Sequence, residues 1–124
     1  MFLNKGALDG QRVFSEGAVQ RMLENHMGPL KFEKMISVAP PITADFDPFE
    51  GTLKTHSFGF MRNEADIPGR RRAGSQSWAG VLNTHYWFDP SADLAGVIMT
   101  QSLPFVEPPL MAAYEAFERA AYAG

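Results

Sequence analysis

Two segments of the chain carry apolar residues at helical spacing, and the first of them follows a helix-capping signal. The side chain of Ser15 can accept a hydrogen bond from an early backbone N–H, and Glu16 complements the positive end of a helix dipole. Val19 and Leu23 then lie on one face. The pattern predicts a helix from Glu16 that ends before Gly28.

The closing segment of the chain predicts a second, amphipathic helix. Its apolar positions recur at i, i+3, i+4 and i+7, and they are Leu110, Ala113, Tyr114, Phe117 and Ala121. The Pro108-Pro109 pair precedes this run, and proline is well tolerated in a first helical turn. Tyr114 and Phe117 are therefore core candidates. Glu115 and Glu118 fall on the polar side, where exposure to solvent is expected.

Between the two helices, several segments favour extended structure. Residues 56–61 predict one strand, residues 77–82 predict the next, and residues 85–88 continue the extended structure. A hairpin turn over residues 89–93 then leads into the apolar run 94–101. Because that run is continuously apolar, we expect a strand that is covered on both faces.

Residues 29–54 show no sustained period and contain several prolines, so we expect an irregular connection. It separates a first region, residues 1–28, from residues 55–124, which hold the predicted strands and the closing helix. The polar stretch 63–72 ends in the basic cluster Arg70-Arg71-Arg72, for which a solvated loop is the usual interpretation. Binding of an anion by this cluster is the weaker alternative.

The composition fits one domain of modest charge. The chain has 124 residues, of which 45% are hydrophobic, and this suffices for one core. Its net charge of −3 creates no field that would attract a nucleic acid. The absence of cysteine removes disulfides, thiolate nucleophiles and cysteine-ligated zinc. No apolar run reaches the roughly 20 residues that cross a bilayer, and the first residues are not a signal peptide, so we expect a cytoplasmic location and no membrane partner.

The segment Trp78-Ala79-Gly80 is the strongest candidate for a site. Small residues inside a strand forfeit packing and backbone entropy, so they often mark a place that a ligand or another backbone approaches closely. The structural alternative is that Trp78 is a packed core aromatic, since tryptophan is highly buried on average. From the residues alone, both interpretations stay open.

Other polar residues favour structural roles. His26, His56 and His85 lie about 30 residues apart, without the short spacing of metal ligands, so we expect hydrogen-bonded or surface histidines and no metal site. Asp89 and Asp93 flank a turn, where aspartate is selected for its side chain to backbone hydrogen bonds.

Several pieces of the sequence, taken in order, resemble the penicillin-recognising serine hydrolases, in particular the class C β-lactamase-like carboxylesterases called family VIII esterases. The matching pieces are residues 2–15, Ser77-Trp78-Ala79-Gly80, Thr84-His85-Tyr86-Trp87-Phe88-Asp89-Pro90, and residues 99–105. Their order and their spacing to a closing helix at residues 117–122 make the set fairly specific.

The resemblance implies an α+β fold, the β-lactamase/transpeptidase-like fold, of which this chain looks like the C-terminal part. Residues 1–28 would be the end of a helical domain, and residues 29–54 would be a proline-rich connection over the active-site side. Residues 55–124 would supply the final antiparallel strands, with the C-terminal helix packed on them.

Members of the family activate a serine with a lysine three residues later on the same helix, and a separate tyrosine helps to move the proton. No serine of this chain has a lysine at that spacing. The resemblance therefore implies a partial serine hydrolase whose nucleophile lies outside the chain, and we expect the chain to be inactive by itself. No cofactor is expected.

The resemblance also assigns roles around the candidate site. Trp78-Ala79-Gly80 matches the Trp-x-Gly motif that replaces Lys-Thr-Gly in the esterase branch, so it would border the substrate cleft. The backbone N–H of Val81 would be one of two oxyanion-hole donors. Since indole cannot complement a carboxylate as lysine and threonine do, Trp78 favours a neutral ester as the small-molecule substrate, with amides or β-lactams as further candidates.

Two alternatives remain open from the sequence. The first is a small α/β module, or a dimer, that binds a protein partner without catalysis of its own. The second is association of the chain, as a homo-oligomer or with the missing N-terminal portion, so that the site is completed at an interface. If the chain is a fragment, exposed strand edges should make it prone to association.

Overall fold

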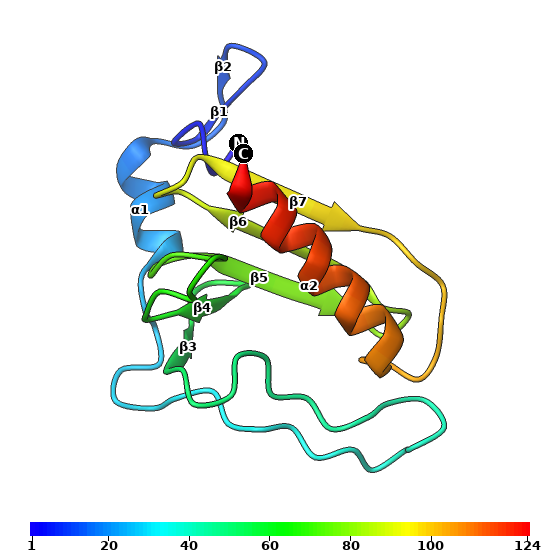
Figure 1. The fold of residues 1–124 in the computed structure, drawn as a ribbon. Coiled ribbons are helices and arrows are strands. Elements are labelled where there is room, and N and C mark those ends of the chain that lie inside the picture. The colour runs from blue at the N-terminus through cyan, green and yellow to red at the C-terminus, as the bar shows by residue number, and fades with distance from the viewer.

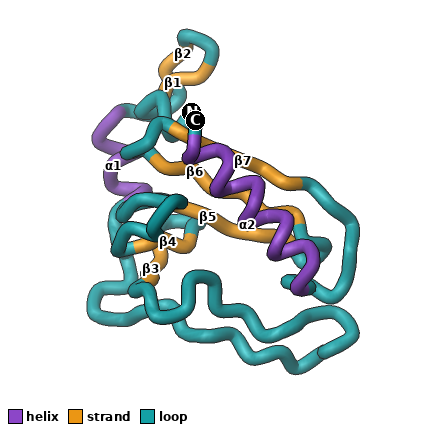
Figure 2. The backbone as a smooth tube through the Cα atoms, viewed as in Figure 1, coloured by secondary structure: helices purple, strands orange, loops and turns teal.

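The computed structural model describes residues 1–124 and arranges them as a five-stranded antiparallel sheet with one long helix across it (Figures 1 and 2). The elements in chain order are β1 (Ala7–Leu8), β2 (Gln11–Arg12), α1 (Glu16–Leu23), β3 (Lys54–His56), β4 (Met61–Asn63), β5 (Gln76–Gly80), β6 (Thr84–Asp89), β7 (Leu94–Ile98) and α2 (Pro108–Ala123). Neither helix is long and apolar enough to cross a membrane. The fold is α+β, as expected.

The sheet is a meander in which each strand pairs with the next one along the chain, in the order β3-β4-β5-β6-β7. The helix α2 covers one face (Figure 1). The buried Trp87 of β6 meets that helix, because its ring makes edge contacts with Tyr114 at 5.8 Å and Phe117 at 5.5 Å between ring centroids. Tyr114 is buried as expected, whereas Phe117 packs on Trp87 with part of its ring still exposed.

Gly96 of β7 is required by this packing. A Cβ atom at Gly96 would lie only 2.1 Å from Cη2 of Trp87, so any larger residue would push the indole out of place. The absence of a side chain on β7 therefore lets the largest side chain of the core lie flat across the neighbouring strand.

The first helix begins where the sequence predicts. Ser15 has an extended backbone, and its hydroxyl oxygen accepts a hydrogen bond from the Ala18 N–H at 3.1 Å. The helix ends at Leu23, earlier than the glycine and proline signals suggest. It is held against the sheet there, because Gln76 donates a hydrogen bond to the Leu23 carbonyl at 3.0 Å and Phe58 N–H donates to the Met22 carbonyl at 3.1 Å.

The strand expected over residues 56–61 is wrong. This segment is instead the turn of a β-hairpin, in which β3 ends at His56, β4 begins at Met61, and the Ser57 N–H donates to the Phe60 carbonyl at 2.9 Å. Gly59 has a positive φ of 94°, a conformation that side chains rarely allow. The glycine thus reverses the chain where the sequence suggested continuous strand.

The expectation of a strand covered on both faces at residues 94–101 is also wrong. β7 ends at Ile98 and is the outer strand of the sheet, with α2 over only one of its faces. Ala95 and Val97 point to the other face and are exposed, Val97 by 57%. The apolar run therefore reflects strand propensity rather than burial on both sides.

Residues 24–53 contain no helix or strand, and a few backbone contacts fold them back on themselves. Met35 and Phe46 exchange two backbone hydrogen bonds, each of 2.9 Å, and the Phe105 N–H donates to the Ile42 carbonyl at 2.7 Å. These contacts place the segment beside the start of α2 in Figure 1. The division into residues 1–28, 29–54 and 55–124 stays a prediction.

The basic cluster and the closing helix form a buried ion-pair network, which corrects two expectations. Arg71 is 2% exposed and Glu118 is fully buried, so neither lies on a solvated surface. Arg71 donates to both carboxylate oxygens of Glu118, at 2.9 and 3.0 Å, and to the Tyr114 hydroxyl at 2.5 Å. Arg70 adds a further bond to Glu118 at 2.8 Å. This network ties the loop after β4 to α2.

We expect Glu118→Gln to cost about 3 to 5 kcal/mol in the free energy of unfolding, because it leaves the buried Arg71 with no carboxylate and Arg70 with only Glu115, at 3.7 Å. Urea denaturation followed by circular dichroism measures this change. The matched control is Glu115→Gln, whose nearer partner Arg119 is half exposed and whose contact with Arg70 is 3.7 Å, and surface pairs of this kind contribute at most about 1 kcal/mol each. Equal losses in the two variants would contradict the assignment.

Candidate functional site

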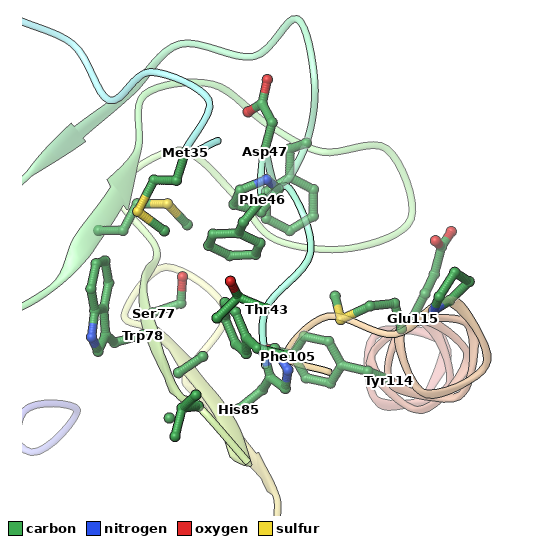
Figure 3. A pocket seen from close by; sticks show the side chains of 18 of the residues that line it. Met35, Thr43, Phe46, Asp47, Ser77, Trp78, His85, Phe105, Tyr114 and Glu115 are labelled. Atoms are coloured by element: carbon green, nitrogen blue, oxygen red, sulfur yellow. The ribbon is translucent and has the colours of Figure 1, made fainter. Parts of the chain in front are cut away.

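A cavity of about 610 Å³ opens between β5, the irregular segment around residues 35–49 and the first turns of α2 (Figure 3). Its lining is largely apolar, with aromatic rings from Phe46 and Phe105 and thioethers from Met35, Met61 and Met111. This volume is that of a small-molecule site, and thioethers adapt readily to irregular ligand shapes. The cavity is therefore the candidate functional site of the chain.

All four residues that the sequence singles out, Trp78, Ala79, Gly80 and Val81, line this cavity. They do so because β5 has a free edge. β4 pairs with β5 only at Gln76 and Ser77, so the last three residues of β5 have a hydrogen-bonded neighbour only on the β6 side. Residues of both faces of β5 consequently reach the same space.

The backbone N–H of Val81 makes no hydrogen bond within the chain. Val81 is the first residue of the turn that joins β5 to β6, and this turn closes through a bond from the Asn83 N–H to the Gly80 carbonyl at 2.9 Å. Because Val81 is half exposed and borders the cavity, its N–H can donate to an acceptor that enters from outside.

Gly80 is not required by packing or backbone geometry. A Cβ atom built there would have its nearest neighbours in Thr84 at 4.0 Å, an ordinary contact, and its φ is not positive. This sets it apart from Gly96, which the fold cannot replace. The open space over Gly80 leaves room for a ligand to pass close to the backbone.

Trp78 forms the outer wall of the cavity and is 39% exposed. Its ring meets His56 edge to face at a centroid separation of 5.3 Å, and Met35 lies across the opening from it (Figure 3). The indole is thus neither a buried core residue nor a free surface residue. It offers one apolar face to whatever the cavity holds.

Several lining residues carry no signal in the sequence, because distant hydrogen bonds bring them to the site. Phe105 is an example. It lies in the segment after β7, which the fully buried Asn83 holds by accepting from the Val106 N–H at 2.6 Å and donating to the Pro104 carbonyl at 2.9 Å. Asn83 has a positive φ of 62°, which asparagine tolerates, so an asparagine in this turn was the one available hint.

Every charged side chain of the lining is paired within the protein. Asp47 accepts from Lys54 at 2.7 Å, and Glu115 accepts from Arg119 at 2.9 Å. Arg70 and Arg71 share the carboxylate of Glu118, and Arg70 also lies 3.7 Å from Glu115. The polar groups that remain are neutral, and they belong to Thr43, Ser77, His85 and Tyr114.

His85 departs from the expectation of a hydrogen-bonded or surface histidine. It is 3% exposed, and its Nε2 atom has no hydrogen-bond partner. The ring lies between Phe105 and Tyr114, at centroid distances of 5.7 and 4.8 Å. Burial, with the nearby charge of Arg71, lowers the pKa of His85 from 6.5 to about 4, so the imidazole is neutral at physiological pH.

The catalytic groups of a serine hydrolase are not assembled within the chain. No serine hydroxyl is hydrogen-bonded to a lysine or a histidine, and the hydroxyls of Ser37 and Ser57 bond to a threonine and a glutamine instead. No group of three or more histidine, aspartate or glutamate side chains is placed to hold a metal ion. Asp89, a turn residue, accepts from the N–H groups of Ser91 and Ala92, as its position in the turn predicts.

No family model matches the sequence, and no curated protein matches it. Solved structures do match. Unliganded simvastatin synthase (LovD) from Aspergillus terreus superposes with a TM-score of 0.74 at 20% identity, over 98% of this chain and 31% of that one. The LovD9 mutant of the same synthase gives a TM-score of 0.71 at 22% identity, over 98% of this chain and 31% of the mutant. The LovD6 mutant gives 0.73 at 20% identity, with 98% and 30% covered.

The chain has the C-terminal part of the β-lactamase-like fold. The antiparallel sheet and the C-terminal helix supply the likeness, which therefore confirms the fold expected from the sequence. The chain spans about a third of the length of the structures that it matches. At these identities the similarity establishes the fold, and the narrower likeness to family VIII esterases stays a hypothesis.

The shifted pKa of His85 makes the stability depend on pH. Between pH 6.5 and about 4, the unfolded chain binds a proton at this residue that the folded chain does not, so the free energy of unfolding falls as the pH falls through this window. Urea titrations at about pH 7 and about pH 5 should show a loss of at most about 2 kcal/mol that is absent in His85→Phe. His26→Phe, at an exposed histidine, should lose as much stability between the two pH values as the wild-type chain does. If His85→Phe also loses that much, the lowered pKa of His85 is refuted.

Proposed function

We propose that the chain forms one wall of the substrate cleft of a serine hydrolase similar to the family VIII carboxylesterases. In this proposal the complete enzyme acts on esters through an acyl-enzyme, and the nucleophile lies outside these residues. The observation that carries the proposal is the unbonded N–H of Val81 at the open edge of β5, directly after Gly80 and beside Trp78.

The chemistry of acyl transfer explains why such an N–H matters. When a hydroxyl attacks an ester carbonyl, the carbonyl oxygen becomes negatively charged, and fixed N–H donors stabilise that charge without having to reorganise. Removal of one such donor typically costs about 3 kcal/mol of transition-state stabilisation. Val81 supplies one donor, and Gly80 leaves the space through which the acyl group reaches it.

The lining of the cavity supports a neutral substrate. By the resemblance, Trp78 stands where the β-lactamase motif has a lysine, and the charged residues of the lining already have partners of opposite charge within the protein. A carboxylate on the substrate would lose its hydration without gaining a partner. We therefore favour esters with an apolar acyl group, and amides or β-lactams are secondary candidates within the same chemistry.

The groups that activate the nucleophile come from another part of the protein in this proposal. The neighbouring structures are about three times as long as this chain, which leaves room for a portion that carries a Ser-x-x-Lys motif. Association with that portion would complete the site, and a homo-oligomer is the other arrangement that could do so.

The first test asks whether the chain by itself has any esterase activity. Neither hydrolysis of nitrophenyl butyrate nor labelling by a fluorophosphonate is expected from the 124 residues alone, because no serine has an activating base. A labelled serine in this chain would overturn the proposal.

The second test asks whether Val81 binds a carbonyl oxygen. The chain has six valines, so labelling with ¹⁵N-valine gives a simple amide spectrum. On titration with methyl 3-phenylpropanoate, a neutral ester, the Val81 amide proton should move downfield while the amide of Val13, in the distant β-hairpin region, stays unchanged. Gly80→Ala should remain folded and lose this response, since the added methyl group blocks the approach to the N–H.

The same titration separates the proposal from its rival. A protein-interaction module without catalysis is favoured by the exposed face of β7, where Val97 lies open on an unpaired edge strand. Such a module has no need of a carbonyl-binding N–H. If the chemical shift of the Val81 amide proton does not change when the ester is added to the wild-type chain, the interaction module is favoured.

A further inference from the structure

We propose that the cavity binds a neutral ligand that carries a hydroxyl group, and that His85 is the residue that binds this hydroxyl. The inference rests on the proposed function only in taking the ligand to be the substrate of the enzyme. It concerns the part of the cavity beside Phe105 and Tyr114, on the α2 side of Trp78 (Figure 3).

The ring of His85 is held rigidly at this position. It projects from β6 opposite Ala79 of β5, and the rings of Phe105 and Tyr114 enclose it, with interplanar angles of 11° and 29°. Two stacked neighbours fix the plane of the imidazole and therefore the direction in which its nitrogens bond. Such a fixed polar group can orient a ligand, because its own freedom is already lost.

The Nε2 atom of this ring is buried without a partner, and this is unusual. Buried side-chain nitrogens are nearly always hydrogen-bonded, since an unbonded one costs about 1 to 3 kcal/mol. The hydroxyl of Tyr114, the polar group of the adjacent ring, accepts from Arg71 at 2.5 Å and makes no bond with Nε2. Nε2 is closed to a water-sized molecule, whereas the other ring nitrogen, Nδ1, also makes no hydrogen bond within the chain and is not closed off, so a ligand in the cavity would reach His85 at Nδ1.

The chemistry of the site selects the ligand class. A neutral imidazole offers one donor and one acceptor, and a hydroxyl group can do both, so it matches whichever nitrogen carries the proton. The lining charges are paired and the other free polar groups, such as Ser77, are also neutral, so an ion would enter without compensation. The apolar remainder of the lining requires an apolar body on the ligand.

The experiment compares three probes that share a phenylpropyl body and differ in the group at its end. These are 3-phenyl-1-propanol, propylbenzene, and 3-phenylpropanoate. Their dissociation constants for the full chain at neutral pH follow from ligand-observed and ¹⁵N amide NMR titrations. We expect the alcohol to bind at least tenfold more tightly than the carboxylate, because the carboxylate alone carries a charge into the cavity.

The role of His85 is isolated by the ratio of the dissociation constants for the alcohol and the hydrocarbon. His85→Phe keeps the stacked ring but removes its nitrogens. In this variant the dissociation constant of the alcohol, divided by that of the hydrocarbon, should rise about tenfold, which is the effect of losing one hydrogen bond. His85→Gln should restore part of the preference. His26→Phe is the matched control, since that histidine lies outside the cavity, and it should leave the ratio unchanged.

NMR of the His85 ring nitrogens in the wild-type chain tests the inference even if a variant does not fold. In the wild-type chain, the ¹⁵N resonances of the His85 ring should shift on addition of the alcohol and stay fixed with propylbenzene. An unchanged ratio in a folded His85→Phe, or fixed ring resonances with the alcohol bound, would overturn the inference.

The outcomes keep the two proposals apart. If the ester moves the Val81 amide but the alcohol preference does not depend on His85, the proposed function survives and this inference fails. If the alcohol preference depends on His85 but the Val81 amide does not shift with the ester, the ligand site is supported and the hydrolase proposal fails.

Discussion

The buried ion pair between Arg71 and Glu118 is the constraint on which the rest of the structure depends. It is the bond that fixes α2 on the sheet from the loop side, and both of its charged groups are withdrawn from water. Buried pairs of this kind contribute little net stability compared with apolar packing, yet breaking one is costly, so they hold a specific arrangement. Here the arrangement decides where the first turns of α2 stand, and with them one side of the cavity.

A second constraint sets the opposite side. Asn83 anchors the segment after β7 and so brings Phe105 beneath the irregular segment, while Met35 and Phe46 close that segment on itself. The result is a largely apolar space whose polar features include the free backbone N–H of Val81 and the imidazole of His85, which projects from β6 opposite Ala79. Such a space suits a neutral molecule with a few polar groups.

The sequence predicted those features that depend on neighbouring residues. The cap at Ser15, the hairpin turn at Asp89 and the amphipathic closing helix all follow from local chemistry, and the structure contains each of them. The errors fall where local patterns are ambiguous. Gly59 was compatible with a strand or a turn, and the apolar run of β7 was compatible with burial on one face or both, because period and composition do not report which elements lie above a sheet.

By itself, the sequence determined the candidate wall of the site, because Trp78, Ala79, Gly80 and Val81 are consecutive and form the end of β5 and the first residue after it. Only the tertiary structure decided that Arg71 and Glu118 are buried partners and that His85 faces a cavity without a bond. The physical reason is separation along the chain: Arg71 and Glu118 are 47 residues apart, and their chemistry depends on a desolvated contact that exists only after folding.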